Sequence, residues 1–168
     1  MALLATLAAI AVPSLSRSMR GHNLDQEADR LLALTNYARD EAASQGIPMI
    51  VWIDADGGRC GVDAKPGFQP AGTENPRARE YALNEDVHFD AVGQGMVAST
   101  IGTVPPQTAN APAGGTHGGV TVAEFAPDGT LDPASLAGAR IVNRANDALN
   151  LTQTTDAYGY EITRDNHP

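Results

Sequence analysis

The spacing of hydrophobic residues in the first 45 positions predicts one long helix. An apolar block, MALLATLAAIAVP, continues without a turn signal into a segment where apolar or small residues recur every three or four positions. That spacing places them on one face of an α-helix. The expected buried stripe consists of Leu24, Ala28, Leu31, Thr35, Ala38 and Ala42. The opposite side, expected to face solvent, carries Asp25, Glu27, Asp29, Arg30, Arg39, Asp40 and Glu41.

The predicted helix is longer than the core of a small domain requires. At about 1.5 Å per residue, a helix over residues 2–45 is roughly 65 Å long. We therefore divide the chain into three parts: a truncated apolar membrane or assembly helix (1–22), the amphipathic half of the same helix (23–46) and a β-rich globular head (47–168). The first part is expected to join a membrane or a bundle of similar helices. The second part is expected to dock on the head.

Short alternating or apolar runs predict the strands of the head. Gly46 and Pro48 end the helix, and 54–58 and 146–147 form turns between neighbouring strands. Two segments rich in proline and glycine, 63–79 and 93–119, are expected to be loops. The strands are expected at 49–53, 59–62, 80–83, 87–92, 120–125, 140–144, 148–152 and 158–163. The fold class is therefore α+β, with a long N-terminal helix packed on an antiparallel sheet or sandwich, and either one bent sheet or two sheets would fit.

The apolar start has three interpretations. As a signal peptide it lacks a preceding basic residue and a good cleavage site. As a complete membrane-spanning helix it is too short, because a bilayer core needs about 20 apolar residues. The interpretation we prefer is the end of a longer apolar helix, followed by an interface segment that contains Arg17 and Arg20.

Charge and cysteine content narrow the choice of function. The 168 residues include 20 acidic and 11 basic ones, which gives a net charge of −9 and disfavours binding to nucleic acid. The single cysteine, Cys60, excludes an internal disulfide and is expected to be a buried strand residue. We predict no metal site, because the Asp54–Gly58 turn lacks the further ligands of a calcium loop. No cofactor is implied.

Catalytic patterns are absent from the sequence. The four histidines, His22, His88, His117 and His167, fall in different predicted elements. No nucleophile motif, phosphate-binding glycine loop or paired metal ligands occur. We therefore predict that the protein is not an enzyme, with no catalytic, cofactor or metal residues.

Five motifs follow one another along the chain. They are Ala11-Val12-Pro13, the arginine-bearing segment after it, the Glu27-Ala28 to Tyr37-Ala38-Arg39 helix, the Gly46-Ile47-Pro48 exit and, late in the chain, the Phe125-Ala126-Pro127-Asp128-Gly129 turn. In this order they resemble type IV pilin-like proteins, and within them the GspH/FimT-type minor pseudopilins of type II secretion. The resemblance is good over residues 3–55, thin over 60–118 and moderate after that.

The resemblance implies a structural subunit of a secretion pseudopilus. Such a subunit contacts other pseudopilins and inner-membrane lipid through its N-terminal helix, as a single-pass protein with its head in the periplasm. Family members carry a leader that a prepilin peptidase removes, and their mature chain begins with a methylated residue followed closely by a glutamate. Met1 falls where the middle of the family's apolar helix is expected, so neither feature can be assigned to a residue of this sequence.

Two other functions remain open at this stage. Some pilus relatives bind DNA through basic residues near the C-terminus of the head, and the candidates here are Arg140, Arg144 and Arg164. Glu161, Asp165 and the overall charge oppose this role. The other possibility is a free periplasmic binding module released by cleavage of a signal.

Overall fold

In the part of the chain that the structure describes, one long helix precedes a head of β-strands and their connections. The computed structural model describes residues 2–68, 75–92, 119–156 and 158–164, and for residues 2–20 and 91 it describes the backbone. Residues 69–74 and 93–118 of the two expected loops lie outside these ranges. The elements are α1 (Ala2–Gln45), β1 (Met49–Asp54), β2 (Arg59–Ala64), β3 (Arg79–Ala82), β4 (Val87–Val92), β5 (Val120–Phe125), β6 (Gly138–Asn143), β7 (Ala148–Gln153) and β8 (Tyr160–Arg164).

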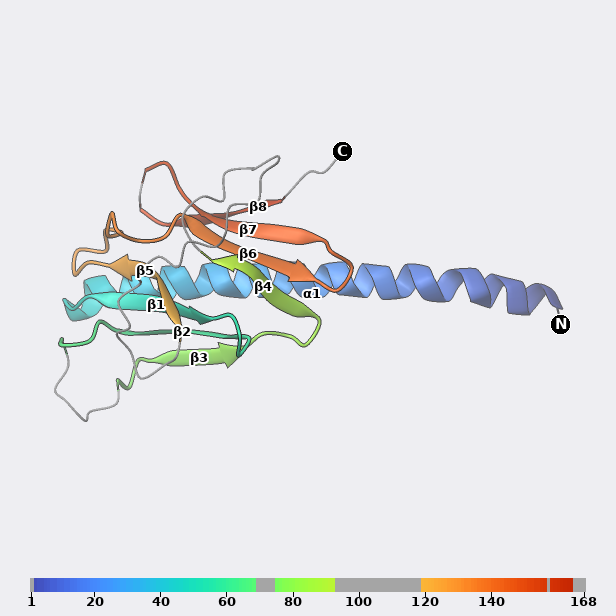
Figure 1. Cartoon of the computed structure of the whole chain (residues 1–168), viewed down its shortest axis with the longest axis horizontal. Helices are drawn as coiled ribbons and strands as arrows, with labels where there is room; N and C mark the ends of the chain where they lie inside the picture. Colours follow the sequence, from blue (N-terminus) through green and yellow to red (C-terminus); the bar gives the residue numbers. More distant parts are fainter. Residues whose placement is uncertain (1, 69–74, 93–118, 157, 165–168) are drawn as a thin grey trace.

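Helix α1 continues unbroken through Pro13 and extends beyond the head. Its C-terminal half lies along the strands, whereas its N-terminal part projects away from them (Figure 1). The helix ends at Gly46, whose amide donates a 2.9 Å hydrogen bond to the carbonyl of Ala42. Gly46 has a φ of 67°, a left-handed conformation that glycine adopts without strain. The predicted helix end is therefore confirmed.

The strands form two antiparallel four-stranded sheets. Sheet A has the order β3-β2-β1-β5, and sheet B has the order β4-β6-β7-β8. In Figure 1, β2 and β3 of sheet A are drawn below α1, and β7 and β8 of sheet B are drawn above it. The sequence was compatible with either one bent sheet or two sheets, and the structure has two separate sheets. The α+β fold class predicted from the sequence is confirmed.

One stripe of α1 supplies the centre of the core. All six predicted stripe residues are buried, from Leu24 at 3% exposure to Ala42 at 0%, and Leu34 adds to them. Strands of both sheets contact the helix. The hydroxyl of Tyr160 in β8 donates to the carbonyl oxygen of Leu136 over 2.9 Å and lies 3.3 Å from that of Val122 in β5. This contact links sheet B to sheet A beyond the helix.

Several predicted strand boundaries differ from the observed ones. Residues 63 and 64 belong to β2 rather than to a loop, and Arg79 belongs to β3. The last strand begins at Tyr160, so Tyr158 lies in the preceding turn and its side chain is 58% exposed. The 146–147 turn is confirmed, with Asn146 at a φ of 66°. Asparagine tolerates this conformation better than most residues, which explains its position at the tip.

Candidate functional site: the projecting helix and its attachment to the head

The part of α1 that leaves the head is the candidate functional site. Leu24 is buried, whereas His22 is exposed. Beside this exit, Arg164 at the end of β8 donates a 2.5 Å hydrogen bond to Asp25. Both side chains are about half exposed, at 63% and 48%, so the pair contributes at most about 1 kcal/mol. The contact nevertheless places the last strand against the helix at the point where α1 emerges.

The other end of α1 contacts the turn that follows β5. The amide of Ala126 donates to the carbonyl of Thr130 over 2.8 Å, and Asp128 accepts the Thr130 hydroxyl over 2.6 Å. Gly129 in this turn is buried, and a Cβ there would lie 3.5 Å from Cγ of Arg39. The Phe125–Gly129 turn therefore ends strand β5 and packs on the last turns of the helix.

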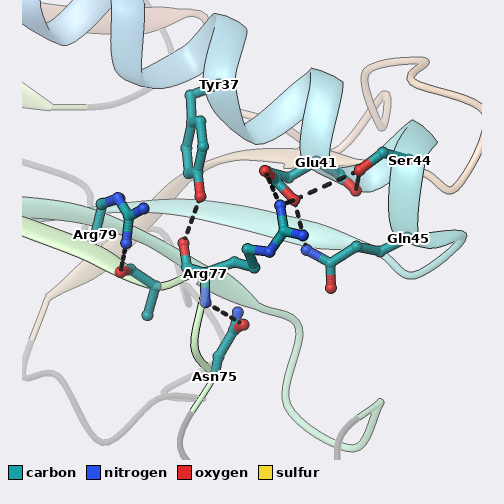
Figure 2. Close-up of polar contacts among 8 residues, drawn as sticks. Tyr37, Glu41, Ser44, Gln45, Asn75, Arg77 and Arg79 are labelled. Carbon is teal, nitrogen blue, oxygen red and sulfur yellow. Dashed lines mark hydrogen bonds and ion pairs between the residues drawn. The ribbon is translucent and has the colours of Figure 1, made fainter.

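A polar cluster joins the C-terminal part of α1 to the segment before β3 (Figure 2). Arg77 donates to Glu41 Oε1 over 2.8 Å, and the Tyr37 hydroxyl donates to the Arg77 carbonyl over 2.8 Å. Gln45 and Ser44 also donate to Glu41. These contacts hold the pKa of Glu41 below its ordinary value, mainly through the hydrogen bond from Gln45, with Arg77 also contributing.

Aromatic contacts and a second ion pair continue this attachment along the helix. The guanidinium of Arg79 lies 5.6 Å from the centre of the Tyr37 ring, and that of Arg30 lies 5.3 Å from the centre of the Tyr81 ring. Arg30 also pairs with Glu27 over 3.2 Å. Such cation–π contacts are favourable by about 0.5–1 kcal/mol at exposed sites.

Glu27 and Glu41 correct the expectation of a uniformly solvated helix face. Their residues are only 5% and 9% exposed. Glu27 pairs with Arg30, whose guanidinium lies over the Tyr81 ring, and Glu41 pairs with Arg77 (Figure 2). Helical spacing alone cannot reveal this, because Arg77 is 36 residues from Glu41 in sequence.

The two histidines that the structure describes lie on different elements. His22 lies on α1 and His88 on β4, both exposed, while His117 and His167 fall outside the described residues. Among the residues that the structure describes, no group of three or more metal-ligating side chains occurs. Cys60 is fully buried, and burial raises the pKa of its thiol to about 11, which keeps it protonated at neutral pH.

Each arginine proposed for DNA contact has an acidic neighbour. Arg140 Nε lies 3.7 Å from Asp90, Arg144 pairs with Asp86 over 3.2 Å, and Arg164 pairs with Asp25. At each of these three arginines, a DNA phosphate would have to displace the neighbouring carboxylate. This arrangement disfavours nucleic-acid binding at the C-terminal strands.

Acid is expected to destabilise the head. Hydrogen bonds lower the pKa of Glu41 from 4.5, and those of Asp54, Asp128 and Asp156 from 3.8. The pKa values of these carboxyl groups are lower in the folded head than in the unfolded chain. The stability that they give the head is therefore fully present above about pH 5 and is lost as the pH falls through the folded-state pKa values. Urea unfolding midpoints between pH 7 and pH 3 should therefore be constant at first and then decrease below about pH 4.5.

The control for this pH dependence is Thr130→Val, which removes the hydroxyl that is the largest cause of the lowered pKa of Asp128. The variant should show a shallower loss of stability on the acid side. A wild-type midpoint that rises between pH 5 and pH 3 would contradict the expectation.

The fold and the site together define an α+β head carried on a helix that continues beyond it. Within the described residues, no helix has a stretch long and apolar enough to cross a membrane. No family model and no curated protein sequence matches this chain. Among solved structures, the chain is similar to the minor pseudopilin EpsH from the Type 2 Secretion System of Vibrio cholerae. The TM-score is 0.45 with 14% sequence identity, over 88% of this chain and 98% of that chain.

Proposed function

We propose that this protein is a minor pseudopilin, a non-catalytic structural subunit of a type II secretion pseudopilus. The observation that carries the proposal is helix α1, whose C-terminal half belongs to the core of the head and whose N-terminal half projects from it. Its projecting residues include the apolar block that the sequence places at the start of the chain. A projecting apolar helix needs a partner surface, because exposed apolar area is unfavourable in water.

In this proposal the apolar part of α1 exchanges lipid for partner helices. In the inner membrane, apolar side chains contact lipid, and the head lies in the periplasm. On assembly the same segment packs among the helices of other pseudopilins, where small residues allow close approach. The sequence of the projecting segment suits such packing, since it contains Ala2, Ala5, Ala8, Ala9 and Ala11. The resemblance of residues 3–55 to the GspH/FimT group supports this choice of assembly.

Site-specific photocrosslinking tests the proposal. A photoreactive residue at position 8 should form covalent adducts with other pilin-like subunits in cells that assemble a type II secretion system. The same residue at Asp56, in the exposed β1–β2 turn, should give few or none. Adducts can be identified by mass spectrometry. Adducts at position 8 that contain lipid but no pilin-like subunit would contradict an assembly role.

A further inference from the structure

The edge strand β3 is weakly attached to the rest of sheet A. Within the described part of the chain, β3 pairs only with β2, and three of its four residues are exposed. The apolar side chains that residues 75–83 contribute to the core are Tyr81 and Leu83, both only partly buried. We call residues 75–83 the strap. Little buried apolar area holds it in place, so polar contacts must supply much of its attachment.

The polar contacts of the strap with α1 are accessible to water. Arg77 is 54% exposed in its pair with Glu41, and Arg30 is 56% exposed where it lies over Tyr81. The hydrogen bond from Tyr37 to the Arg77 carbonyl is likewise at the surface. Water competes for the exposed arginine and tyrosine groups and weakens each contact, although the Glu41 carboxylate itself is buried. Loss of one of them should measurably loosen the strap.

A buried carboxylate oxygen next to the strap lacks a hydrogen bond. The side chain of Glu27 is 93% buried, with an exposure of 7%, and its Oε2 atom has no hydrogen-bond partner among the described residues. Unsatisfied buried polar groups lose their hydration without compensation. Lifting the strap would return water to this carboxylate, which offsets part of the cost of the contacts that are broken. The Tyr81 hydroxyl, by contrast, interacts with the thiol of Cys60 in the closed state.

We propose that the strap opens as a unit while α1, the other strands of sheet A and sheet B stay folded. Local opening of this kind is expected where few apolar contacts hold a segment. Tyr81 is the register partner of Cys60 across the β2–β3 pair, and Cys60 has no exposed surface in the closed state. Opening therefore exposes the thiol of Cys60. The proposal is independent of the assembly role.

The single cysteine makes the opening measurable. Cys60 of the full-length protein should react with a thiol reagent such as DTNB in native buffer, with a rate that depends only weakly on urea below the unfolding transition. Tyr37→Phe removes the hydroxyl that donates to the Arg77 carbonyl, and should raise the reaction rate about fivefold. Arg77→Ala should raise it at least as much.

Lys65→Ala is the matched control, because Lys65 forms a partly buried ion pair with Glu124 in β5 rather than with a residue of the strap. It should leave the rate of Cys60 unchanged. The proposal would be overturned if Cys60 reacted only with the urea dependence of global unfolding. It would also be overturned if Tyr37→Phe raised the reaction rate of Cys60 by no more than its effect on the free energy of global unfolding accounts for. The same holds if Tyr37→Phe raised this rate no more than Lys65→Ala does.

Discussion

Gly138→Ala is expected to lower the free energy of unfolding by about 3 kcal/mol, because β6 has no space for a side chain at this position. A Cβ on Gly138 would lie 1.9 Å from the carbonyl oxygen of Leu151. That oxygen belongs to the backbone of β7, whose register pairs Gly138 with Thr152 and Ala139 with Leu151. The two strands would have to separate to admit the methyl group. Urea unfolding followed by the fluorescence of Trp52 measures the effect, since Trp52 is buried and is the protein's one tryptophan.

Gly159→Ala provides the control for Gly138→Ala. No atom lies within 4 Å of a Cβ built on Gly159, in the turn before β8 of the same sheet. Its free energy of unfolding should stay within about 0.5 kcal/mol of the wild-type value. Equal stability of the two variants would contradict the close approach of β6 and β7 at Gly138.

A charge in the projecting part of α1 is expected to prevent assembly. Ala8→Asp places a carboxylate in the apolar block, and an aspartate at the centre of an apolar helix costs about 2.5–3.5 kcal/mol in a membrane. Incorporation into a pseudopilus should then decrease about a hundredfold. The yield of crosslinked or co-purified pilin-like subunits measures this loss. The free energy of unfolding of the head should not change, because the substitution lies outside the folded core.

Ala33→Asp introduces the same charge into the same helix, at an exposed position within the head. It should assemble like the wild type. If Ala8→Asp and Ala33→Asp assembled equally well, the apolar block would have no role in joining the subunits.

Much of the fold could be predicted from periodicity. The buried stripe from Leu24 to Ala42 repeats at helical spacing, and the uninterrupted apolar run 49–53 predicts a strand covered on both faces, as found in β1. Gly46 and Asn146 indicate chain reversals through their backbone preferences. These features depend on residues close in sequence, which is why the sequence reveals them.

Features that depend on distant partners could not be predicted. The burial of Glu41 requires Arg77, and that of Glu27 accompanies the stacking of Arg30 on Tyr81. The division into two sheets depends on β4 pairing with β6 rather than with β3, which alternation within β4 does not encode. The projecting helix was predicted because its length and apolar content are local properties. The strap was missed because its attachment depends on the tertiary placement of β3.

The contacts of one helix stripe with both sheets have a mechanical consequence. A force along the axis of α1 acts parallel to these contacts, so it loads the strands of sheets A and B in shear and at the same time. The strands that contact α1 lie in both sheets, so they share such a force. Pulling on the apolar end would therefore be resisted by these strands together.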